Sequence, residues 1–180
     1  MEAHVWNVVC SGFYQLRQLC SIQRSLPTDA RRTLAAAFIA SRVAYCNGVL
    51  YGVSLQVSRR LQMVLNAAAR LGRYEHITPA LREVLHWLPV PQRIQFKVAI
   101  SAFDCVREHC PTYFNNVCIP VAGISGRANL RSAERHDMLV PSTRTQLGRR
   151  SFHVAAPVVW NALPSQLRSS SISRGQFRAP

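Results

Sequence analysis

The side chains best suited to chemistry are three thiols and an imidazole between positions 105 and 118. Cys105 and His109 are one helical turn apart, and Cys110 and Cys118 follow them. Thiolate sulfur and imidazole nitrogen are ligands that zinc prefers, so a metal site is one interpretation. The spacing fits no standard zinc module, however, and Cys105 falls on an apolar helical face. Buried thiols are the preferred interpretation, and we expect no metal and no other cofactor in this chain.

Carboxylates are too few and too dispersed for metal-dependent phosphoryl transfer. The chain has 8 acidic residues, and only the pairs Asp104/Glu108 and Glu134/Asp137 are close in sequence. Two-metal chemistry needs clustered carboxylates to hold the ions. The GxSxG and Walker motifs are also absent from the sequence. We therefore expect no catalytic residue, although whether the chain belongs to an enzyme is left open.

Positive charge is the dominant property of the composition. The chain carries 22 basic and 8 acidic residues, a formal net charge of +14, and all but one of the basic residues are arginine. Such an excess predicts attraction to the phosphates of RNA or DNA. Arginine suits bidentate phosphate contacts and stacking on bases, although codon usage in a GC-rich genome would explain the same preference.

Apolar periodicity predicts a mainly α-helical fold of packed helices. The expected helices cover residues 5–25, 28–48, 54–71, 79–87 and 91–109. Gly12 lowers the helix propensity of the first segment. Thr78 and Pro79 open the fourth helix, and Pro89 and Pro91 separate it from the fifth. The fifth is apolar around most of its circumference, so we expect other segments to pack around it.

The composition changes near Pro120. We expect a helical region over 1–120 and a basic, partly disordered region over 121–180 that is irregular and contains short extended segments. Met138 to Val140 is expected to be extended, and Phe152 to Trp160 to supply core residues.

The sequence also bears on the compartment. It shows no secretory signal and no apolar run of transmembrane length, so no membrane partner is expected. Six cysteines without a CxxC pair favour free thiols in a reducing compartment. The expected location is therefore intracellular, in a reducing compartment.

The third expected helix offers a polar face opposite its apolar one. Arg59 and Arg70 are about three turns apart and project from one side, where they could contact phosphates. Gln62 and Asn66 lie between them and could bind sugars or base edges. An ordinary solvated helix face is the alternative. In the basic C-terminal region the candidate phosphate contacts are Arg127, Arg131, Arg149 and Arg150.

Four blocks of the sequence resemble the C-terminal region of non-LTR (LINE-type) retrotransposon reverse transcriptases, of the jockey-like and chicken-repeat-like groups. The blocks occur in the family's order and are SLPTDARRTLAAAFIASRVAYCNGVLYG, RRLQMVLNAAARL, HITPALREVLHWLPVPQRIQFK and SFHVAAPVVWNALPSQLRS. The resemblance covers nearly the whole chain. It implies thumb and post-thumb sequence that follows a polymerase palm and grips the template-primer. The parent activity would be RNA-directed DNA polymerisation with Mg in the palm. The resemblance also implies a location in the nucleus or cytoplasm of a eukaryote.

The chain departs from the family in ways that matter for function. The family's catalytic tyrosine-x-aspartate-aspartate motif and its endonuclease are missing from this sequence. Ala44 stands where the family pattern has aspartate, the loop from Leu71 to Tyr74 is shortened, and relatives continue beyond Pro180. The resemblance therefore implies a truncated fragment of a transposable-element polymerase with residual, non-specific RNA or DNA binding. Two alternatives stay open: a helical protein-interaction module that docks on a polymerase palm, and a non-functional translated relic.

Overall fold

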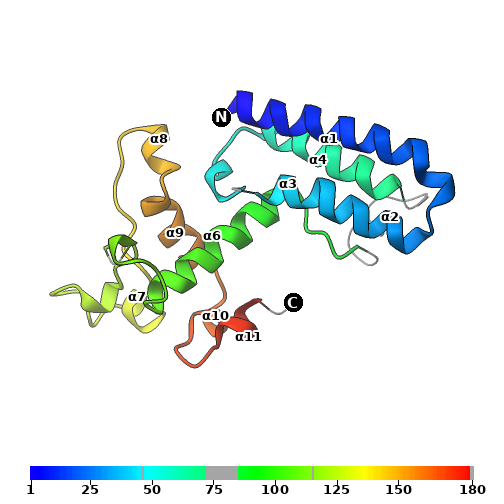
Figure 1. Ribbon diagram of the computed structural model, residues 1–180. Helices are drawn as coiled ribbons and strands as arrows, with labels where there is room; N and C mark the ends of the chain where they lie inside the picture. The colour runs from blue at the N-terminus through cyan, green and yellow to red at the C-terminus, as the bar shows by residue number, and fades with distance from the viewer. Residues whose placement is uncertain (46, 72–84, 115, 179–180) are drawn as a thin grey trace. The chain divides into compact units, whose positions relative to one another are not determined.

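The computed structural model of the protein describes residues 1–45, 47–71, 85–114 and 116–178. These residues are mainly α-helical, which confirms the fold class expected from the sequence (Figure 1). The chain divides into two compact units, Met1–Ile94 and Gln95–Pro180. The division falls within α6 (Val90–Val106), earlier than the change in composition near Pro120. Residues 95–120 thus group with the basic C-terminal part of the chain.

Two long helices, α1 (Glu2–Ile22) and α4 (Leu55–Arg70), lie side by side in the first unit (Figure 1). They approach closely at Gly12, where a Cβ atom would lie only 2.6 Å from Cγ1 of Val64. Apolar residues at helical spacing on both helices form the core between them. They are Val5, Val9, Leu16 and Leu19 on α1 with Leu61, Val64, Leu65 and Ala68 on α4. A short 3-10 turn, η1 (Gln23–Ser25), follows α1.

The segment expected as one helix over 28–48 is helical but ends earlier. It consists of α2 (Thr28–Ala35), a π-helical turn η2 (Ala36–Ala40) and α3 (Ser41–Ala44). Tyr45 then turns extended with a ψ of 125°. A 3-10 turn, η3 (Asn47–Leu50), comes next. The expected end at Asn47 and Gly48 is wrong by a few residues, because the backbone leaves the helix at Tyr45.

Most of the helix expected over 79–87 lies outside the described residues. Residues 85–89 are described and are not helical, so the expected end at Trp87 is wrong. His86 has a φ of 51°, a left-handed conformation that ends a helix. Trp87 is nevertheless buried, at 9% exposure. The next helix, α6, begins at Val90 rather than at Pro91, because proline is tolerated in the first turn of a helix.

α6 is buried along much of its length, as its composition predicts. The buried residues are Ile94, Val98, Ala99, Ile100, Ala102 and Phe103. Phe96, which the periodicity places beside this face, is 39% exposed instead. The helix ends at Val106 and not at His109, because Glu108 adopts a φ of 57°. The His109 N–H then donates to the carbonyl of Asp104 at 2.9 Å, a bond typical of a Schellman helix end.

Short helices and one isolated β-bridge occupy the part of the second unit that was expected to be irregular. The main helices are α7 (Arg131–Glu134), α8 (Gln146–Arg149), α9 (Phe152–Asn161), α10 (Ser165–Arg168) and α11 (Arg174–Arg178). Met138, expected to be extended, forms an antiparallel bridge with Pro120. The Asn161 side chain binds the backbone of Met138 on both sides of the residue. Its Oδ1 accepts from the Met138 N–H at 2.8 Å, and its Nδ2 donates to the Met138 carbonyl at 2.9 Å.

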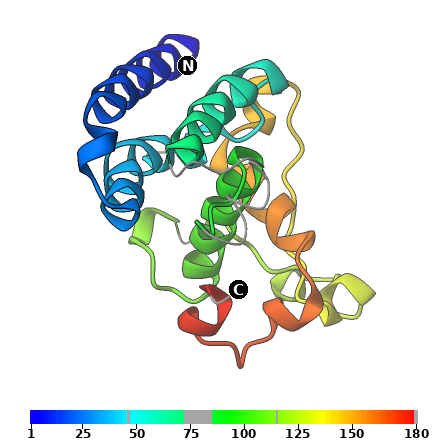
Figure 2. The same ribbon diagram turned by 90° about the vertical axis from the view of Figure 1, so that its right-hand side faces the viewer.

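Aromatic packing anchors the C-terminal segment to α6 within the second unit. The ring centroid of Phe103 lies 4.6 Å from that of Phe177 and 6.5 Å from that of Trp160. Phe177 is only 6% exposed, so α11 is held against α6 (Figure 2). The Trp160 Nε1–H also donates to the His136 carbonyl at 2.9 Å, which satisfies a polar group that burial would otherwise leave unpaired.

The contact at Gly12 makes a prediction about stability. Gly12→Val should lower the free energy of unfolding by about 2–3 kcal/mol, because the added methyl groups meet Val64, which has no exposed surface. Urea denaturation followed by circular dichroism measures the change. Gln18→Val is the matched control, since Gln18 is exposed on the same helix and carries the same cost of β-branching. Equal losses for the two variants would contradict the close-packing explanation.

Candidate nucleic-acid interface

α4 carries the central part of the predicted phosphate-binding surface. The Ser54 hydroxyl caps the helix by accepting a hydrogen bond from the Val57 N–H at 3.4 Å. Arg59 and Arg70 are both exposed on this uninterrupted helix, roughly 16 Å apart along its axis. Within the described part of the chain, neither guanidinium belongs to an ion pair. Both charges are therefore available to an anion in solution.

Gln62 and Asn66, which were predicted to meet sugars or bases, make contacts inside the first unit. Oε1 of Gln62 accepts a hydrogen bond from the Val90 N–H at 2.9 Å. Its Nε2 donates to Oδ1 of Asn66 at 2.8 Å. Both side chains are only partly exposed. Because the first N–H groups of a helix have no partner within that helix, Gln62 supplies one for the start of α6. The polar face of α4 therefore serves folding at its centre and is free at its two arginines.

The candidate arginines of the second unit fall into two separate groups. Arg127 and Arg131 are exposed beside and on α7. Arg149 is exposed at the end of α8, whereas Arg150 is partly buried and takes part in an interaction. α7 and α8 lie well apart from each other in both views (Figures 1 and 2). These four residues accordingly do not form one continuous basic surface.

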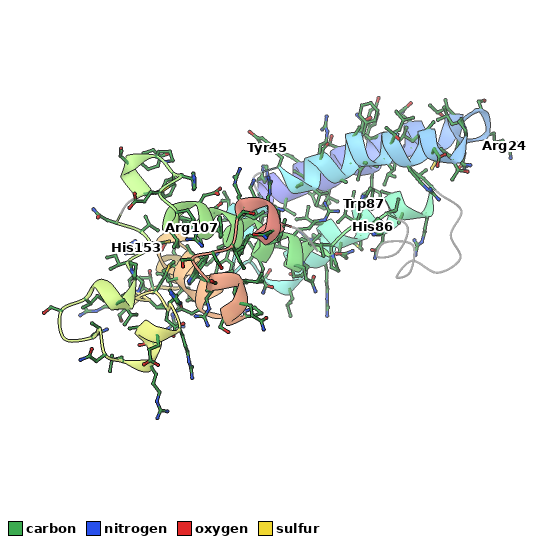
Figure 3. All side chains as sticks on the ribbon, turned by 90° about the horizontal axis from the view of Figure 1, so that it is seen from below. Arg24, Tyr45, His86, Trp87, Arg107 and His153 are labelled. Atoms are coloured by element: carbon green, nitrogen blue, oxygen red, sulfur yellow. The ribbon has the colours of Figure 1, made fainter. Side chains whose placement is uncertain are left out.

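Several arginines without a predicted role hold the fold together. In the first unit, Nη1 of Arg31 donates to the Leu71 carbonyl at the end of α4, at 3.3 Å. In the second unit, Arg107 (labelled in Figure 3) donates from Nη2 to the Ser169 carbonyl at 2.6 Å. No local sequence signal could have identified these contacts, because each pair lies dozens of residues apart in the chain.

Two ion pairs strengthen the same part of the second unit. Arg168, only 7% exposed, pairs with Asp137. Arg174 donates from Nε and Nη2 to the two carboxylate oxygens of Asp104, each at 2.7 Å. These hydrogen bonds raise the pKa of the Arg174 guanidinium. Two of the 8 acidic residues are therefore paired with arginines that lie 31 and 70 positions away in the chain.

Three of the four residues considered as metal ligands lie together. The Cys105 thiol is within hydrogen-bonding reach of the Cys110 and Cys118 thiols. Burial raises the pKa of Cys105 strongly and that of Cys118 to about 11. Metal binding requires the thiolate, which this environment disfavours. In the residues that the structure covers, no group of three or more His, Cys, Asp or Glu side chains is arranged to hold a metal ion.

Comparisons with models of known protein families, with curated proteins and with solved structures found no match. None of the helices in the described ranges combines the length and apolar character needed to cross a bilayer.

The role of Gln62 can be tested by truncation. Gln62→Ala should lower the free energy of unfolding by about 1–2 kcal/mol, because it leaves the buried Val90 N–H without a partner. Nucleic-acid affinity of the folded variant should be unchanged if the side chain serves only the fold. Gln56→Ala is the matched control, since Gln56 is exposed on the same helix. Loss of affinity without loss of stability would restore the predicted contact with nucleic acid.

The thiols should differ in reactivity toward an alkylating reagent at pH 8. The raised pKa values leave Cys105 and Cys118 almost entirely protonated, and only the thiolate reacts. The exposed Cys10 and Cys20 should therefore be modified first. Peptide mapping by mass spectrometry measures each rate. Raising the pH toward 11 should speed modification of Cys118, and rates at Cys118 equal to those at Cys20 at pH 8 would contradict this environment.

Proposed function

We propose that the chain binds RNA or DNA without sequence specificity, through contacts of its exposed arginines with phosphates. The exposed arginines Arg59 and Arg70 on α4, which form no ion pair with any described residue, carry this proposal. They lie on one rigid helix, so two phosphate contacts are positioned before a ligand binds. The resemblance of the sequence to the thumb region of LINE-type reverse transcriptases supports the same function.

The distribution of charge also supports a polyanionic partner. The whole chain has a net charge of +14. Among the described residues, Asp29, Asp104 and Asp137 already pair with arginines. Each pair neutralises one arginine together with one carboxylate, so the net charge of +14 is carried by the residues outside these pairs. Release of counterions from nucleic acid by such a surface gives binding that weakens steeply as salt increases.

The proposal extends to the origin and setting of the chain. It is a fragment of a retrotransposon RNA-directed DNA polymerase, and polymerisation with Mg belongs to a palm that this sequence lacks. None of its own residues is assigned a catalytic role. The free thiols of the described cysteines suit a reducing compartment, in the nucleus or cytoplasm.

A salt titration tests the phosphate contacts. The double variant Arg59→Ala, Arg70→Ala should weaken binding to RNA and DNA of any sequence. It should also reduce the slope of log affinity against log salt by roughly 1.4 to 1.8, the contribution of two phosphate contacts. Fluorescence anisotropy at several salt concentrations measures the slope. Helicity should be retained, because alanine favours helices.

The control for this experiment removes the same charge from other positions. The control is the double variant Arg32→Ala, Arg174→Ala. Each of these arginines already pairs with a carboxylate. This variant should change the salt slope much less. An unchanged slope in the folded Arg59/Arg70 variant, or an equal change in both variants, would leave general charge or docking on a protein partner as the better explanation.

A further inference from the structure

A groove with a volume of about 520 Å³ runs between α1 and α4 on the surface of the first unit. It is lined by Trp6, Val9, Cys10, Phe13, Tyr14, Arg17, Arg60 and Met63. The structure shows that only some of them are core. Val9 is buried, whereas Phe13 remains 42% exposed.

Two aromatic rings of the groove are largely exposed. Trp6 is 55% exposed and Tyr14 is 61% exposed. Trp6 and Phe13 are seven positions apart on α1, or roughly 10 Å along the helix axis. That separation allows the rings to receive two different flat groups rather than one. Large aromatic side chains that a fold leaves exposed on one face mark a binding surface.

Among the described residues, the charged side chains that line the groove are arginines. Arg60 lies over the Trp6 ring, with its Cζ 5.9 Å from the ring centroid. Arg17 is exposed on the α1 side. No carboxylate occurs in the lining as far as the structure describes it. Stacking on Trp6 restrains the Arg60 guanidinium while its N–H groups remain able to donate in the plane. The groove therefore combines flat apolar surfaces with restrained positive charge.

We propose that this groove binds single-stranded nucleic acid, with bases stacked on Trp6, Phe13 and Tyr14 and with phosphates held by Arg17 and Arg60. This inference rests on the proposed function and names a second, chemically different contact for the same partner. A single strand supplies exposed aromatic faces together with regularly spaced negative charge, which is the combination the groove complements. A base-paired duplex keeps its bases stacked inside and offers none to these rings.

Cys10 provides a direct probe because it lines the groove, whereas Cys20 is exposed on the same helix outside it. A thymidine oligonucleotide of about 12 nucleotides, the length that such sites cover, should slow alkylation of Cys10 severalfold and leave Cys20 unchanged. An abasic oligomer of equal length and charge should give little protection. Peptide mapping by mass spectrometry measures both thiols in one sample.

Substitution of the rings provides the second test. Trp6→Ala, Tyr14→Ala should weaken binding of the thymidine oligonucleotide at least fivefold, the smallest loss expected for about one stacked base. Binding of the abasic oligomer should not change. The matched control is Phe38→Ala, Tyr45→Ala, which removes two exposed aromatic rings of the same unit that lie outside the groove. Circular dichroism confirms that each variant is folded.

The outcomes separate this inference from the proposed function. Equal protection of Cys10 by the abasic oligomer, or equal losses in the ring variant and its control, would overturn the stacking groove. Phosphate binding would survive either result if the Arg59/Arg70 variant still lowers the salt slope. Protection of Cys10 by a designed acidic amphipathic helix, without protection by the oligonucleotide, would assign the groove to a protein partner instead. No binding of any oligomer would overturn both proposals.

Discussion

The burial of α6 is the constraint on which the rest of the structure depends. A helix that is apolar around most of its circumference is not stable in water on its own. Within each unit, other residues must therefore cover the part of α6 that belongs to that unit. In the first unit, Gln62 satisfies the N–H of Val90 at the start of the helix. In the second unit, Phe103 draws Trp160 and Phe177 from distant parts of the sequence onto one aromatic cluster. The C-terminal segment is ordered because it completes this cover.

The arginines divide into two functional classes because carboxylates are scarce. Those that meet a carbonyl or a carboxylate inside a unit, such as Arg107 and Arg168, fix the path of the chain. Those that find no carboxylate in the described structure, such as Arg59 and Arg70, leave their charge exposed to solvent. The same composition thus stabilises the fold and produces a basic surface, and the carbonyls and carboxylates within reach of each arginine decide which role it takes.

α4 connects the two proposed contacts with nucleic acid. Its buried face packs on α1, and the consecutive residues Arg59 and Arg60 point about 100° apart around the helix. Arg59 belongs to the phosphate-binding face, whereas Arg60 borders the aromatic groove with Trp6. A strand that stacks its bases in the groove would therefore pass close to the guanidinium on the adjoining face. Packing of one helix sets the geometry of both sites.

The sequence by itself determined the helical class, the apolar face of α4, the burial of α6 and the sign of the surface charge, because periodicity and composition are local properties. It predicted helix ends less accurately, because no capping motif in the sequence marks Tyr45 or Glu108 as the residue at which the backbone leaves the helix. Only the tertiary structure decided that Gln62 serves α6 and that Trp6 stays exposed. Those outcomes depend on which segments pack together across long separations in the chain, and amphipathic spacing alone does not specify the partner of a face.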